Sequence, residues 1–170
     1  MDATADWSSS PAIIAPPQNG QLQLKTGEFC TSTTSGFDGL VTVDADFKAD
    51  QVASEGWLLV PFGAGGSRFG QLRIRTTRSS DTSQTTTLET WTGASFETLM
   101  IVRELSANTI QHRLVIDPKI NEVGWWVNER FRGRFSVNKD RTSSLPTIQF
   151  GALNGLATFD FLSVRVGSQP

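Results

Sequence analysis

The chain has 170 residues, a length that suits one domain able to bury its own core. Its net charge of −2 provides no overall positive field that would favour nucleic acid or an anionic membrane surface. Cys30 is the only cysteine and His112 the only histidine, which excludes an intrachain disulfide and any site built from several histidines.

The first 20 residues, MDATADWSSSPAIIAPPQNG, have no basic start and no continuous apolar core, so they do not predict a signal peptide. No stretch of the chain approaches the roughly 18 apolar residues of a membrane-spanning helix. Residues 1–18 are rich in Ser and Pro and are predicted to form an extended lead-in. Residues 19–170 are predicted to form a single domain.

Sequence patterns typical of β-strands occur throughout residues 19–170. In 40–49, odd-numbered apolar residues alternate with even-numbered polar ones, which is typical of a strand with one buried face. Residues 56–63 are apolar on both faces, as in a covered central strand. Residues 71–77 place Arg73 and Arg75 outward. The other predicted strands are 21–26, 85–92, 96–105, 110–117, 123–131, 134–137, 147–153 and 158–167.

No window carries a helical apolar period beyond about one turn. Turn signals recur at roughly 8–12-residue intervals, a spacing that indicates an antiparallel sandwich or barrel. The mixture of alternating strands and strands that are apolar on both faces favours two stacked sheets over a closed barrel. We therefore predict an all-β, antiparallel two-sheet sandwich.

Four segments carry a resemblance to a known superfamily. NGQLQLKTGEFCTS, FDGLVTVDADFKA, HRLVIDPKINEVGWWVNERFRG and TFDFLSVRVG follow one another in an order similar to that of the concanavalin A-like lectins and glucanases, which include laminin-G-like domains. The resemblance covers nearly the whole chain. It implies a jelly-roll sandwich, a glycan as partner and an extracellular or cell-surface location.

The same resemblance leaves the activity open, because one fold serves many functions. The glucanase branch carries a Glu-x-Asp-x-x-Glu strand that this sequence lacks, so we expect a non-catalytic, lectin-like module that binds a poly- or oligosaccharide on the concave sheet. Two alternatives remain, a glycoside hydrolase or polysaccharide lyase of the same fold, and a structural or adhesion module that binds protein.

Carboxylates provide the candidate catalytic residues of the enzyme alternative. Asp44 and Asp46 share a strand face at a spacing of about 7 Å, which is compatible with the paired carboxylates of glycosidases. Glu89 and His112 complete the set. The ordinary interpretation is a pair of acids on a solvated strand and a histidine packed in the core.

Five tryptophans and no tyrosine suggest indole platforms for the apolar faces of sugar rings. Trp125 and Trp126 must point to opposite faces of their strand, and the outward one, taken to be Trp126, shares its face with Asn128. Trp91 shares a face with Glu89. Either tryptophan could instead only cover a sheet surface.

Two further features concern charged ligands. Arg73 and Arg75 could bind sugar carboxylates or sulfates, with Arg103 extending the same groove, or could form a solvated rim. Asp160 lies on the closing strand, where the superfamily holds a structural calcium, and oxygen ligands suit that ion. We expect no other cofactor.

Overall fold

The computed structural model describes residues 7–10, 20–32, 40–63, 70–137 and 147–166, which are entirely strands and connecting turns. Of the predicted lead-in 1–18, residues 1–6 and 11–18 lie outside the described residues, and Trp7–Ser10 forms strand β1. The described ranges contain no helix that could cross a membrane.

The remaining strands are β2 Leu22–Lys25, β3 Phe29–Ser32, β4 Val41–Ala49, β5 Glu55–Phe62, β6 Gly70–Ser80, β7 Ser83–Trp91, β8 Phe96–Glu104, β9 Ile110–Asp117, β10 Glu122–Val127, β11 Arg130–Ser136, β12 Gln149–Asn154 and β13 Leu156–Val166.

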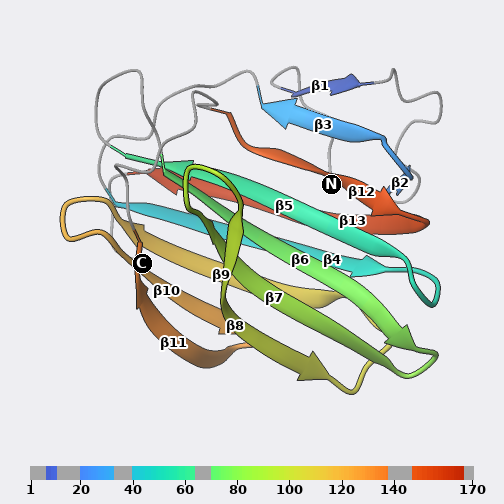
Figure 1. The fold of residues 1–170 in the computed structure, drawn as a ribbon. Coiled ribbons are helices and arrows are strands. Elements are labelled where there is room, and N and C mark those ends of the chain that lie inside the picture. Colours follow the sequence, from blue (N-terminus) through green and yellow to red (C-terminus); the bar gives the residue numbers. More distant parts are fainter. Residues whose placement is uncertain (1–6, 11–19, 33–39, 64–69, 138–146, 167–170) are drawn as a thin grey trace.

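These strands form two packed sheets (Figure 1). One sheet has seven strands in the order β1-β3-β12-β5-β6-β7-β8, and the other has six in the order β11-β10-β9-β4-β13-β2. All of these neighbouring strands are antiparallel. The predicted two-sheet antiparallel sandwich is therefore confirmed.

The alternation in the sequence decides which residues fill the space between the sheets. Along β4 the odd-numbered apolar positions are buried, and β9 shows the same alternation. The largest fully buried side chains come from both sheets and are Trp125, Phe47, Phe62, Phe150 and Phe159. Many polar side chains of the strands project from the two outer faces, where a ligand has access, whereas others such as Thr76, Thr86 and His112 are buried.

Two irregularities shape the outer face of the six-stranded sheet. The predicted strand 123–131 is wrong in its extent, because Asn128 and Glu129 have φ values of 48° and 64° and turn the chain between β10 and β11. Positive φ at both central positions is the geometry of a tight hairpin that matches the strand twist. In β13, a bulge between Phe159 and Phe161 removes Asp160 from the pairing with β4.

Candidate functional site

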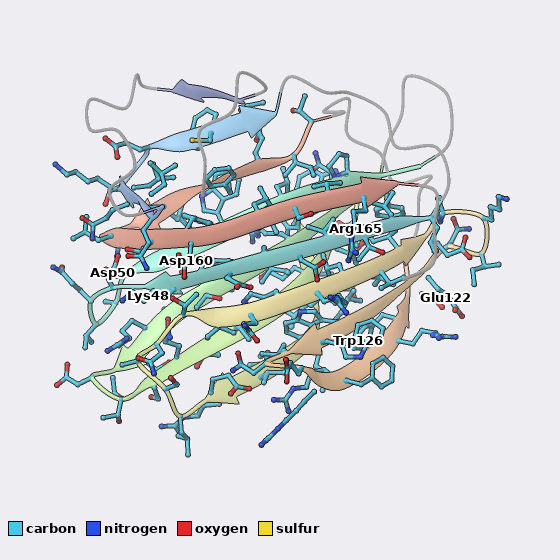
Figure 2. All side chains as sticks on the ribbon, turned by 180° about the vertical axis from the view of Figure 1, so that it is seen from behind. Lys48, Asp50, Glu122, Trp126, Asp160 and Arg165 are labelled. Atoms are coloured by element: carbon cyan, nitrogen blue, oxygen red, sulfur yellow. The ribbon has the colours of Figure 1, made fainter. Side chains whose placement is uncertain are left out.

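A hollow of about 710 Å³ lies on the outer face of the six-stranded sheet. It spans β4, β9, β10 and β13, and Figure 2 looks onto this face. The lining residues are Asp44, Asp46, Gln111, His112, Arg113, Trp126, Glu129, Ser163 and Arg165. Of these residues, the sequence predicted only Asp44, Asp46, His112 and Trp126 as site residues.

Trp126 provides the aromatic wall of this hollow, and its ring is held from below and from the side. A Cβ atom on Gly124 would come within 2.8 Å of the indole, so the ring lies directly over the bare backbone of that glycine. Phe131 supports it laterally, with ring centroids 4.9 Å apart. The indole is thus preorganised as a flat platform on the sheet surface.

Asp44 organises the cationic wall. Its two carboxylate oxygens accept hydrogen bonds from Arg113 Nε at 2.6 Å and Arg165 Nη2 at 2.8 Å. The three side chains come from three adjacent strands, because β4 pairs with both β9 and β13. Both guanidinium groups are about half exposed, so they keep donors that can reach a ligand.

Asp46 is the uncommitted acceptor of the hollow. No hydrogen bond or ion pair from a described residue reaches its carboxylate. Burial, and then the negative charges of Asp160 and Asp44, raise the pKa of Asp46. This carboxylate can therefore accept a hydrogen bond from a ligand hydroxyl group.

Asn128 has a structural role at the hairpin next to the hollow. Its Oδ1 accepts a hydrogen bond from the Gln111 backbone N–H at 3.0 Å, and its Nδ2 donates to Glu104 Oε2 at 3.1 Å. The amide predicted to bind ligand therefore links the turn to β9 and to β8 of the other sheet.

A second cluster occupies the outer face of the seven-stranded sheet. Glu89 is 3% exposed and accepts a hydrogen bond from Arg73 Nε at 2.5 Å, while Arg75 Nη2 lies 3.1 Å from its other oxygen. Phe96 lies beneath the Arg73 guanidinium, 3.9 Å from ring centroid to Cζ, and contacts Trp91. The structure therefore brings together four residues that were predicted to bind ligand, namely Arg73, Arg75, Glu89 and Trp91.

One correction follows from the sheet assignment. Trp91 lies on β7 of the seven-stranded sheet and Trp126 on β10 of the six-stranded sheet, and both project outward. One ligand cannot contact both rings, so the expectation that a single binding surface uses them together is wrong. The alternation along each strand indicated that both rings point away from the core. It did not indicate which sheet each strand joins.

His112 lies with its imidazole in the core, 2% exposed, between Phe47 and Trp125. Burial lowers its pKa to about 3. Its backbone lines the hollow from beneath, and the side chain faces the opposite way. This placement agrees with the packed histidine of the ordinary interpretation and keeps the imidazole away from a ligand.

The described residues contain no group of three His, Cys, Asp or Glu side chains arranged to hold a metal ion. Asp160 sits at the bulge of β13, near Asp46, and the calcium predicted there stays a prediction. Cys30 is buried, and burial together with the charge of Glu28 raises the pKa of its thiol to about 11. That thiol is therefore neither a ready nucleophile nor a ready metal ligand.

Comparison with known proteins finds similarity at the level of structure. No protein-family model matches the sequence, and no curated protein matches it. A β-glucanase of Bacillus licheniformis has a TM-score of 0.62 and 15% identity, with 98% of this chain and 95% of that chain covered. A native glycosidic hydrolase has a TM-score of 0.70 and 9% identity over 98% and 93% of the two chains. The carbohydrate-binding module CBM66 from Bacillus subtilis has a TM-score of 0.58 and 14% identity over 97% and 98%.

Proposed function

We propose that this chain, whose fold is the concanavalin A-like jelly-roll sandwich, is a non-catalytic module that recognises a poly- or oligosaccharide. One observation carries the proposal. The preorganised indole of Trp126 forms a wall of a hollow whose other walls supply charged donors and acceptors. We place its action outside the cell or at the cell surface, as the resemblance implied.

Sugar rings suit this arrangement because they combine apolar C–H faces with a rim of hydroxyl groups. The Trp126 indole would stack on a ring face. Asp46 would accept hydrogen bonds from hydroxyl groups, and Arg113 and Gln111 would donate to ring and hydroxyl oxygens. The names of the structurally similar glucanase and carbohydrate-binding module support the same class of ligand.

The direct test is a glycan and polysaccharide array, followed by affinity measurements on the Trp126→Ala and Trp91→Ala variants. We expect Trp126→Ala to reduce affinity by at least about tenfold, as expected for the loss of a central aromatic contact. Trp91→Ala, on the opposite sheet, is the matched control and should keep wild-type affinity. A blank array on folded protein would overturn the proposal and favour a module that binds protein.

A glycoside hydrolase is the second candidate, favoured by the contrast between two acids in the hollow. Asp44 accepts hydrogen bonds from two arginines, whereas the raised pKa of Asp46 suits a proton donor. Pairs of carboxylates with divergent environments perform acid and nucleophile roles in such enzymes. Release of reducing ends from a polysaccharide panel, abolished by Asp46→Asn, would establish this function in place of simple binding.

A further inference from the structure

Trp126 borders two hollows on the same outer face. The second has a volume of about 190 Å³ and lies further along β9 and β10. Its lining residues are Leu40, Val115, Asp117, Ile120, Glu122, Gly124, Trp126 and Arg134. Both hollows border the same indole, which lies between them, and we call the two together the β9 groove.

Strand geometry sets the length of this groove. Gln111 and Arg113 line the first hollow, Val115 and Asp117 line the second, and all four project from the same face of β9. Six residue steps along a strand span about 20 Å. That distance is several sugar rings long, so a single sugar would leave most of the groove empty.

The two ends of the groove differ in chemistry. Asp44, Asp46 and two arginines surround the first hollow, whereas Leu40, Val115 and Ile120 give the second an apolar wall. Ile120 is 59% exposed, so its apolar side chain is accessible to a ligand. A chain of sugar rings could place hydroxyl groups in the first hollow and a ring face against the second.

The charges of the groove disfavour an acidic ligand. Five carboxylates and three guanidinium groups line the two hollows. Each guanidinium is already paired, Arg113 and Arg165 with Asp44 and Arg134 with Glu122 at 3.7 Å. An anionic sugar would meet excess negative charge and no unpaired cation in the groove.

We infer that the ligand of the β9 groove is an uncharged, linear sugar chain that spans both hollows and crosses the Trp126 indole. This inference rests on the proposed function and adds to it the charge of the ligand and its minimum length. It also assigns Gly124 as a positioning residue, because only a residue without Cβ lets the indole lie flat where the two hollows meet.

Titration calorimetry of the wild-type chain tests the inference. The probes are neutral oligosaccharide ladders of two to six residues built from glucose, xylose, mannose, galactose or fructose, with polygalacturonate and heparin as anionic probes. We expect affinity for one neutral ladder to rise by about tenfold or more between two and four residues, as each occupied hollow adds contacts. Binding without length dependence, or a preference for an anionic probe, would overturn this inference and leave the proposed function standing. Absence of binding to every probe would overturn both.

Two variants separate the halves of the groove. Ile120→Asp should reduce affinity for long chains toward that of the disaccharide and leave disaccharide affinity unchanged. Ile101→Asp, equally exposed at 62% but on β8 of the other sheet, is the matched control and should change neither value. Equal weakening of short and long ligands by Ile120→Asp would contradict a two-hollow groove.

Gly124→Ala tests the platform itself. Its Cβ would displace the indole rather than the backbone, so circular dichroism and Tm should stay near wild type while tryptophan emission shifts. We expect affinity for every ligand length to fall by about tenfold. Unchanged affinity together with a shifted emission spectrum would show that the flat indole is not part of the site.

Discussion

Trp125 and Trp126 are neighbours in the sequence and lie on opposite faces of β10, one fully buried and the other at the wall of the groove. Replacing each with alanine should therefore have opposite consequences. We expect Trp125→Ala to lower the free energy of unfolding by about 3–5 kcal/mol, the cost of a cavity from a large core aromatic. Trp126→Ala should lower the free energy of unfolding by about 1 kcal/mol or less and reduce glycan affinity by at least about tenfold. Urea denaturation of both variants checks this, and equal destabilisation would contradict the assignment of faces.

The buried His112 predicts a loss of stability in mild acid. Its folded pKa of about 3 lies below the ordinary value of 6.5, so its contribution is complete above pH 6.5 and is lost as pH falls toward 3. At pH 5 the loss amounts to about 2 kcal/mol, from 1.4 kcal/mol per pH unit below the unfolded pKa. Thermal denaturation at pH 7 and pH 5 should show a smaller difference in His112→Phe than in the wild type. The same difference in both proteins would mean that other groups cause the acid sensitivity.

Glu89 on the seven-stranded sheet should matter for stability and not for glycan binding. Glu89→Gln removes the charge that two arginines share. We expect a loss of about 2 kcal/mol, below the range for a fully buried pair because both guanidinium groups are partly exposed. Chemical denaturation measures the loss, and Glu97→Gln, an exposed acid on β8, is the matched control. Reduced glycan affinity in Glu89→Gln would move the binding site to this sheet.

Asp46 should make ligand binding depend on pH. Its raised pKa means that the folded state takes up this proton more readily than the unfolded state, so the ionised form destabilises the fold at neutral pH. Asp46→Asn should therefore raise the Tm at neutral pH, and the exposed Asp81→Asn should leave it unchanged.

The same substitution should alter binding. Glycan affinity of the wild type should fall on acidification, as protonation weakens Asp46 as an acceptor, and the affinity of Asp46→Asn should be lower and nearly independent of pH. Calorimetry across a pH series checks both. A wild-type affinity that does not change with pH would show that the Asp46 carboxylate does not contact the ligand.

Local pattern predicted most of the strands and the faces of individual residues, but it predicted neither Trp7–Ser10 nor Phe29–Ser32 as a strand. The alternation of Val41 to Phe47 and the apolar run of 56–63 correctly indicated a sandwich core, because burial of one strand face has a fixed period of two. The hairpin at Asn128 was missed as a boundary because neither central residue is the glycine that such turns prefer.

The arrangement of the site could not be predicted in the same way. Asp44 and Arg165 are 121 residues apart and meet only because β13 pairs with β4. Strand partners at such separation depend on the whole topology, which leaves no local period in the sequence. For the same reason Trp91 and Trp126 were assigned to one surface, although their strands belong to different sheets.

The position of β12 and β13 has a consequence for biosynthesis. β12 lies between β3 and β5, and β13 lies between β4 and β2, so residues 149–166 complete both sheets. A ribosome must therefore polymerise nearly the entire domain before either sheet can close, and the nascent chain carries unpaired strand edges until then. Such non-local pairing slows folding and exposes the chain to aggregation.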